Sequence, residues 1–349
     1  MSSWWPLIKL IPKQTNLKFV SFAVPAGTIS LLLVLASFGS MLSAGFRENP
    51  IQIYQEAPGG PAEKVGAILA KGFNLGIDFK GGTLVEMEAP AAIDVGAVRE
   101  QVSGMGLGDV QVQSFGDVNH ALIRFESPEG SNPALVVDQV KAELREVVSG
   151  VTFTRTEVVG PKVSGELFTS GLMALGVALL LMMVYIWFRF EWQFGLGAVL
   201  GLFHDVILTM GLFSFLRLEF TLTIIAALLT IIGYSMNDTV VVFDRMRENL
   251  RKYKKKSLAD VVDLSVNETL SRTIMTGVTT LMALGGLMFL GGDSLFGFAF
   301  ACFFGIVIGT YSSVYVAAPA VLIWGVKRGE GEPKRYGTEG EPEAEWPKG

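Results

Sequence analysis

The sequence predicts a bundle of six membrane-spanning helices with one α+β domain, of ferredoxin-like βαββαβ order, between its first two helices. Half of the 349 residues are hydrophobic and only 17% are charged. A soluble protein of this length would need more charged residues on its surface. Six apolar stretches also have the length, ~20 residues, that a helix needs to cross the hydrocarbon core of a bilayer. These two observations place most of the chain in a membrane.

The apolar stretches are separated by short polar connections, apart from one long interval after the first. They are Phe19–Leu42, Phe168–Phe188, Phe194–Leu216, Thr221–Phe243, Thr273–Leu290 and Leu295–Trp324. The first apolar run is too long for a signal peptide, and no clear small-residue cleavage site follows it. We therefore expect it to remain as the first transmembrane helix.

The distribution of Lys and Arg predicts the orientation. Basic residues gather before the first stretch, in Asp244–Ser257 between the fourth and fifth, and after the sixth. On the other side, the connection between the third and fourth stretches has Arg217 as its only basic residue. The connection between the fifth and sixth, Gly291–Ser294, has none. We expect an inner-membrane protein with both termini cytoplasmic and the long interval in the periplasm. The basic run is best explained as a solvated loop that sets topology. Contact with anionic lipid or a cytoplasmic partner is the alternative, and nucleic-acid binding is not expected.

These assignments divide the chain into consecutive parts. They are a cytoplasmic N-terminus (1–18), helix 1 (19–42), a periplasmic domain (43–167, core about 73–160), a five-helix region (168–325, with a basic cytoplasmic loop at 244–272) and a disordered tail (326–349).

The periplasmic domain shows short strand and helix patterns. The expected strands are Gly82–Glu88, Val110–Phe115, Ala121–Phe125 and Thr152–Val159. The expected helices are Ile93–Met105, which opens at Asp94, and Pro133–Val148, which follows the cap-like Ser131–Asn132. Gly116–Asp117 predicts a turn, and Gly59–Pro61 predicts a flexible connection before the domain. Nothing in this domain has a catalytic pattern. A tethered domain of this kind is suited to contact with another protein.

The chain lacks the residues for common catalytic and metal chemistry. Cys302 is the only cysteine, and His120 and His204 lie far apart in sequence. A disulfide within the chain is impossible, and we expect no metal site and no cofactor. No phosphate-binding loop of the GxxxxGK[ST] type occurs. The sequence therefore predicts a protein that is not an enzyme and draws on an ion gradient.

Three apolar stretches contain ionisable groups, which are costly in a bilayer and need a reason. The third stretch contains His204–Asp205, the fourth contains Asn237–Asp238, and Arg272 begins the fifth. The fourth and fifth helices run antiparallel, so Asp238 and Arg272 can pair. Pairing with Arg272 would keep Asp238 ionised, whereas separation of Asp238 from Arg272 in an apolar setting would favour the protonated form of Asp238. Such an alternation is what a proton carrier needs.

Helical spacing extends these groups into polar stripes. Tyr234 and Thr230 lie one and two turns before Asp238, and Thr276 and Thr280 lie one and two turns after Arg272. Asp205 and Thr209 form a shorter stripe of the same kind. A structural salt bridge with hydrogen-bonded helix contacts is the alternative for Asp238 and Arg272. The same alternative stays open for His204 and Asp205, because adjacent residues of a helix point partly to different faces. The candidate proton-pathway residues are Asp238, Arg272, Asp205, His204, Thr276 and Tyr234. We expect Asp244 and Arg245 to cap or snorkel at the helix end. The Gly197–Gly201 and Gly305–Gly309 spacings predict close helix packing.

Four motifs together resemble the SecF members of the SecD/SecF family. They are GIDFKGG (Gly76–Gly82), FHDVILTMG (Phe203–Gly211), GYSMNDTVVVFDRMREN (Gly233–Asn249) and NETLSRTIMTGVTTL (Asn267–Leu281). The resemblance covers roughly residues 10–325. SecD proteins carry AVDAN where this chain has SMNDT, which favours SecF. Residues matching the family motifs are Gly76, Asp78, Gly81, Gly82, Asn237, Asp244 and Arg245.

The resemblance implies a subunit that acts with SecD, in a fold like half of a resistance–nodulation–division transporter. Its implied partners are the SecYEG channel, YajC, the preprotein emerging in the periplasm, and the lipid bilayer. It further implies that proton flow drives late steps of export, with Asp238 and Arg272 in the proton pathway. A small-molecule exporter would need a second six-helix half and a second large external domain. A passive assembly scaffold would tolerate Asp238→Asn.

Overall fold

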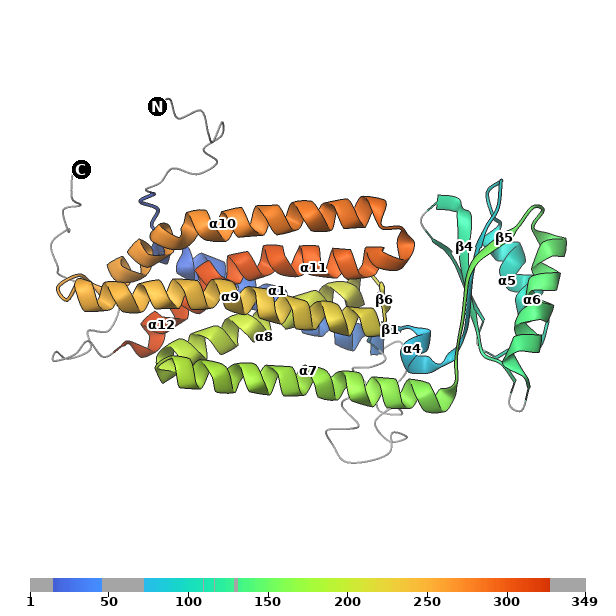
Figure 1. Ribbon diagram of the computed structural model, residues 1–349, viewed down its shortest axis with the longest axis horizontal. Coiled ribbons are helices and arrows are strands. Elements are labelled where there is room, and N and C mark those ends of the chain that lie inside the picture. The colour runs from blue at the N-terminus through green and yellow to red at the C-terminus, as the bar shows by residue number, and fades with distance from the viewer. Residues whose placement is uncertain (1–14, 46–71, 109, 116, 129–130, 327–349) are drawn as a thin grey trace, which may run out of the picture.

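The computed structural model describes residues 15–45, 72–108, 110–115, 117–128 and 131–326. A helix bundle forms one end of this part of the chain, and a small sheet domain forms the other (Figure 1). The predicted flexible connection at Gly59–Pro61 and the predicted tail beyond Val326 lie outside the described residues.

Within the described residues, six helical segments are long and apolar enough to cross a membrane, which confirms the predicted number. The long helices are α1 (Ala23–Gly45, after the short turn η1, Val20–Phe22), α7 (Pro161–Arg189), α8 (Trp192–Phe215), α9 (Leu222–Lys252) and α10 (Leu258–Leu290). The sixth segment consists of α11 (Asp293–Ser312), the π-helical turn η2 (Ser313–Ala317) and α12 (Ala318–Trp324).

Two helices extend far beyond the predicted apolar stretches. The predicted basic loop at 244–272 is mostly helix, because α9 continues to Lys252 and α10 already begins at Leu258. Charged side chains pair across the two helices here, as in the 2.6 Å ion pair from Arg245 to Glu268. Ser257 caps the start of α10 by accepting from the backbone of Asp260. A search for apolar residues alone cannot find helical turns that polar pairing stabilises.

The sheet domain has four antiparallel strands in the order β3-β4-β2-β5. Its elements are β2 (Gly82–Glu88), α5 (Val95–Ser103), β3 (Gln111–Phe115), β4 (Asp117–Phe125), α6 (Pro133–Val147) and β5 (Thr152–Val159). Asp94 and Asn132 cap the two helices, as the sequence predicts. Helices α5 and α6 cover the face of the sheet that points away from the bundle (Figure 1). Their valines form a core with Val85, Ile123 and Phe125 of the sheet.

Between the sheet domain and the bundle lies a joint that the sequence did not reveal. Strand β1 (Asn74–Leu75) pairs in parallel with β6 (Glu219–Phe220), which immediately precedes α9. The one-turn helix α4 (Ile77–Lys80) follows β1 and leads into β2. Two-residue strands that pair across almost 150 residues leave no periodic pattern in a sequence.

Small residues allow close contacts between helices of the bundle, as the glycine spacings predict. A Cβ atom on Gly305 of α11 would lie 2.4 Å from the side chain of Ile231 on α9. A Cβ on Gly197 of α8 would lie 2.7 Å from the carbonyl oxygen of Ala317. Because glycine has no side chain, the helices approach each other more closely at these two positions than any other residue would permit.

Candidate functional site

The polar residues inside the bundle come from α8, α9, α10 and α11, which pack against one another. Two of them are aspartates: Asp205 on α8 is 1% exposed, and Asp238 on α9 is 3% exposed. The structure surrounds these two aspartates very differently.

Asp205 is held by side chains from two other helices. Its Oδ2 accepts hydrogen bonds from the hydroxyls of Ser235 on α9 and Ser312 on α11, the second at 2.9 Å. Its Oδ1 lies 3.1 Å from Nδ1 of His204. The residue thus ties three helices together.

Ser312 reaches Asp205 at the point where the last segment changes its helical form. The π-helical turn η2 begins directly after Ser312, and the backbone nitrogen of Ala318 donates to the carbonyl of Ser313. Pro319 follows, and it has no N–H to donate to the preceding turn of a regular helix. Such π turns inside α-helices are common at functional sites.

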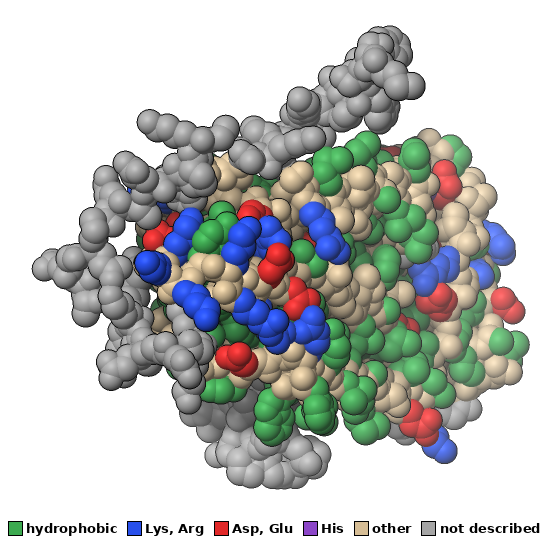
Figure 2. Space-filling view, turned by 60° about the vertical axis from the view of Figure 1, so that its left-hand side comes forward, with side chains coloured by type: hydrophobic (Ala, Val, Ile, Leu, Met, Phe, Trp, Pro, Cys, Tyr) green, Lys and Arg blue, Asp and Glu red, His purple; other side chains and the backbone are tan. Residues whose placement is uncertain are grey.

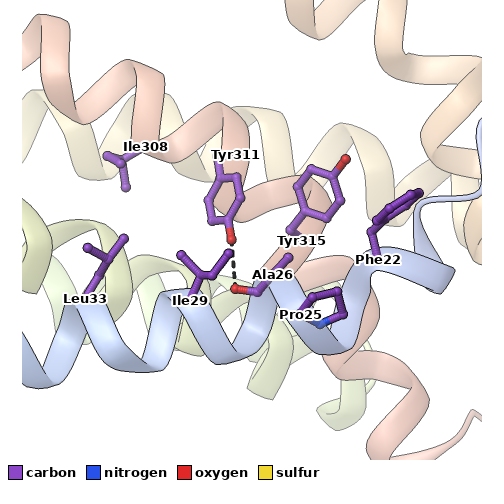
Figure 3. A pocket seen from close by; sticks show the side chains of 8 residues that line it. All are labelled: Phe22, Pro25, Ala26, Ile29, Leu33, Ile308, Tyr311 and Tyr315. Carbon is purple, nitrogen blue, oxygen red and sulfur yellow. Dashed lines mark hydrogen bonds between the residues drawn. The ribbon is translucent and has the colours of Figure 1, made fainter.

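His204 lies beside Asp205, close to the contact between α8 and α1. The sequence placed the two neighbours partly on different faces, but the structure brings their side chains together. The ring of Tyr311 lies 6.2 Å from the His204 ring, measured between centroids. The Tyr311 hydroxyl donates to the carbonyl of Ala26 on α1 at 2.9 Å (Figure 3). His204 therefore belongs to a set of contacts that anchors the first helix.

Asp238 lacks the partners that Asp205 has. Within the described part of the chain, its Oδ2 is buried and makes no hydrogen bond. The hydroxyl of Tyr234, one turn earlier on α9, is likewise buried and unpartnered there. A Cβ on Gly277 of α10 would lie 3.8 Å from that hydroxyl, so Tyr234 points toward α10.

The predicted ion pair between Asp238 and Arg272 is not formed. Among the described residues no ion pair within 4.0 Å joins them, although the charge of Arg272 acts on Asp238 through space. Asp238 is enclosed in the bundle, whereas Arg272 lies exposed on its surface. The two groups are neighbours without contact.

The threonines of the predicted stripes bond to their own helices. Thr276 donates to the carbonyl of Arg272 at 3.1 Å, and Thr280 donates to that of Thr276 at 2.8 Å. Thr209 does the same with the carbonyl of Asp205. These hydroxyls are thus occupied by backbone.

Asp244 and Arg245 lie within α9 rather than at its end. Asp244 accepts two hydrogen bonds from Arg189, at 2.7 and 2.8 Å, at the end of α7. Arg245 pairs with Glu248 and with Glu268 of α10. Both residues therefore join helices, and neither caps one.

Residues of the GIDFKGG motif form the joint between sheet domain and bundle. Asp78 accepts a 2.8 Å hydrogen bond from the backbone nitrogen of Leu222, the first residue of α9. Gly81 and Gly82 have φ angles of 77° and 108°, which side chains strongly disfavour. They turn the chain from α4 into β2.

Sequence reasoning missed one ion pair in this joint. Arg124 of β4 lies 2.7 Å from Glu219 of β6, and its side chain is only 6% exposed. Burial raises the pKa of Glu219, although the positive charge of Arg124 opposes the shift. Both residues lie outside the apolar stretches, where a charged side chain is ordinary, so no sequence pattern indicates this pair.

A bundle of six apolar helices joined to a separate α+β domain is the architecture of a multi-pass membrane protein. The model of the family "Protein export membrane protein SecD/SecF, C-terminal" matches residues 139–327, and that of the "SecD/SecF GG Motif" matches residues 66–89.

Curated relatives are similar over almost their whole length. The protein translocase subunit SecF of Cereibacter sphaeroides is 44% identical over 330 residues, which cover 92% of this chain and 94% of that protein. SecF of Rhodobacter capsulatus is 45% identical, with 92% of both chains covered. SecF of Rickettsia bellii is 39% identical, with 93% of this chain and 98% of that protein covered. The chain belongs to the SecF family of protein translocase subunits.

Two solved structures share the fold. SecDF of Thermus thermophilus, described as a translocon-associated membrane protein, has a TM-score of 0.74 and 33% identity over 91% of this chain. SecDF in a super-membrane-facing form has a TM-score of 0.60 and 34% identity over the same share. The chain spans 40% of each of those longer chains.

Proposed function

We propose that this chain is the SecF-type subunit of a bacterial protein-export complex and acts with SecD to couple the proton motive force to late steps of preprotein translocation. Asp238 is the proton-exchanging group in this proposal, and nucleotide hydrolysis plays no part. The family membership supports the role in export, and the surroundings of Asp238 support the role of protons.

The observation that carries the proposal is the unpartnered oxygen of Asp238. A buried carboxylate oxygen that makes no hydrogen bond with the described residues is costly, so it is retained only where it has a use. Asp205 shows that this bundle can satisfy an enclosed carboxylate completely. We therefore assign Asp205 and His204 to holding helices together and Asp238 to exchange of a proton.

The exposed polar side chains near Asp238 support a partner within the membrane. Asn237, Arg272 and Thr279 lie exposed on α9 and α10, although both helices are apolar enough to span a bilayer. Polar groups at such depth normally face protein or a water-filled cavity rather than lipid. We propose that SecD covers this face and completes the surroundings of Asp238 and Arg272.

The arrangement of charge supports an orientation with both termini in the cytoplasm. Segments η1 and α12 lie at the end of the bundle opposite the sheet domain (Figure 1). Lys and Arg side chains gather at the same end, around the connection between α9 and α10 (Figure 2). By the positive-inside rule this end is cytoplasmic, and the ferredoxin-like sheet domain lies in the periplasm. There it would meet the emerging preprotein, beside SecYEG and YajC in the inner membrane.

The proposed cycle follows from the charge of Asp238. Ionised Asp238 attracts Arg272, and a proton taken up from the periplasmic side removes that attraction. The contact between α9 and α10 then relaxes, and proton release to the cytoplasm restores it. Each charge that crosses 100 mV supplies ~2.3 kcal/mol for the movement.

Export of a reporter precursor tests this proposal, in cells depleted of their own subunit and supplied with this chain. Asp238→Asn should assemble with SecD at normal levels and leave export as slow as in depleted cells. Asp238→Glu, which keeps an ionisable group, should retain part of the activity. Asp138→Asn, at an exposed site on α6, is the matched control. Normal export with Asp238→Asn would refute proton coupling at this residue and favour a passive scaffold.

A further inference from the structure

Helix α4 is wedged between the sheet domain and the bundle. Ile77 is buried against Leu84 and Leu122, on the face of the sheet opposite α5 and α6. Phe79 packs instead on the bundle, with ring centroids 5.5 Å from Phe168 of α7 and 6.1 Å from Phe220. One helical turn therefore has an apolar contact with each part.

Asp78, between these two side chains, is bound to the beginning of α9. Its carboxylate accepts from the backbone nitrogen of Leu222 at 2.8 Å. The N-cap residue Thr221 makes no side-chain cap, because its hydroxyl bonds to that of Thr223. An acidic group at a helix N-terminus is favoured by the unpaired N–H groups and by the helix dipole. Asp78 thus supplies the cap from a residue 144 positions away.

A second connection runs from β4 to the residue pair that precedes α9. Arg124 forms the 2.7 Å ion pair with Glu219, and its Nη1 also donates to Gln111 of β3 at 3.3 Å. A Cβ on Gly76 would lie 2.8 Å from the Glu219 carboxylate, so glycine is needed for this approach. Backbone and side-chain contacts therefore fix the sheet domain to one end of α9.

We propose that Asp78, Arg124 and Glu219 are positioning residues that lock the sheet domain to the N-terminal end of α9, so that movement of α9 started at Asp238 turns the sheet domain. The inference rests on the proposed function of Asp238. Asp238 lies 16 residues after Leu222 on the same unbroken helix, about 24 Å along its axis. A continuous helix carries a displacement over that length, and the lock passes it to the strands.

The test measures a distance between the two parts by electron paramagnetic resonance. The full chain is assembled with SecD in lipid nanodiscs, with its only cysteine removed by Cys302→Ala. Spin labels are attached through Gln139→Cys on α6 and Leu290→Cys at the end of α10, both exposed sites. Asp238→Asn, which mimics the protonated state, is compared with the parent in three backgrounds: intact, Asp78→Ala and Arg124→Met.

In the intact background, Asp238→Asn should shift the distance distribution. Asp78→Ala and Arg124→Met should abolish the shift and broaden the distribution. Asp78→Asn should keep it, because an amide oxygen can still accept from Leu222. A shift of the same size in both Asp78→Ala and Arg124→Met would overturn the proposal.

Export measured on the same variants separates this inference from the proposed function. If Asp238→Asn stops export without any shift in the intact background, the lock does not transmit movement, and only the inference fails. If Asp238→Asn exports normally, the proposed function fails and the inference fails with it.

Discussion

Ser312 donates a 2.9 Å hydrogen bond to the carboxylate of Asp205, 107 residues earlier in the chain. Ser235 donates to the same oxygen from a third helix. Asp238, enclosed in the same bundle, has a carboxylate oxygen that makes no hydrogen bond among the described residues. The two aspartates thus differ in what their substitution should change: stability at Asp205, and proton exchange at Asp238.

Replacement of Asp205 should cost stability. Asp205→Ala removes the acceptor of two hydroxyls and of the His204 contact, and the loss should be about 3 kcal/mol. Ser312→Ala removes one donor and should cost about 1 kcal/mol. Thermal unfolding in detergent measures both, with Asp138→Ala as an exposed control. Unchanged unfolding of Asp205→Ala would contradict the role of Asp205 as a tie between helices.

Close packing at Gly197 predicts a second loss. In Gly197→Ala the new methyl group would meet the Ala317 carbonyl at 2.7 Å, so α8 and η2 must separate. Overpacking of this kind costs about 1–3 kcal/mol. Gly176→Ala on α7 is the matched control, because its Cβ position faces open space, with no atom beyond its own stretch of helix within 4 Å. Equal unfolding temperatures for the two variants would show that the contact at Gly197 is not tight.

The partly buried carboxyl of Glu219 predicts a dependence of stability on pH. Burial raises its pKa above the ordinary value of 4.5, so the folded chain holds this proton more tightly than the unfolded chain. Stability should therefore rise as the pH falls through the range between 4.5 and the raised pKa. Against Glu219→Gln, the parent should gain stability as the pH falls. The comparison is made by thermal unfolding at stepwise lower pH, and a relative loss for the parent would contradict the direction of the shift.

Much of the fold follows from local sequence patterns. Apolar length identifies the six spans, and alternation with caps at Asp94 and Asn132 identifies the elements of the sheet domain. The sequence pattern did not predict the polar ends of α9 and α10, because ion pairs rather than apolar residues stabilise them. The pairing of β1 with β6 was not predicted, because each strand has only two residues and leaves no alternating pattern.

The site was predictable in its residues but not in its contacts. Charge inside an apolar stretch singles out Asp205, Asp238 and Arg272. Helical spacing cannot show that Asp205 meets Ser312 or that Arg272 faces outward, because both depend on the rotation of neighbouring helices. Glu219 and Arg124 lie outside the apolar stretches, where charge needs no explanation and gives no signal.

The most direct test of proton exchange at Asp238 is the rate of proton entry into liposomes that contain this chain assembled with SecD. An inwardly directed pH gradient is applied, and a trapped dye reports the internal pH. Asp238→Asn should reduce the rate of proton entry to that of liposomes without protein, while Asp138→Asn should leave the rate unchanged. An unchanged rate for an Asp238→Asn complex that assembles normally would contradict the account.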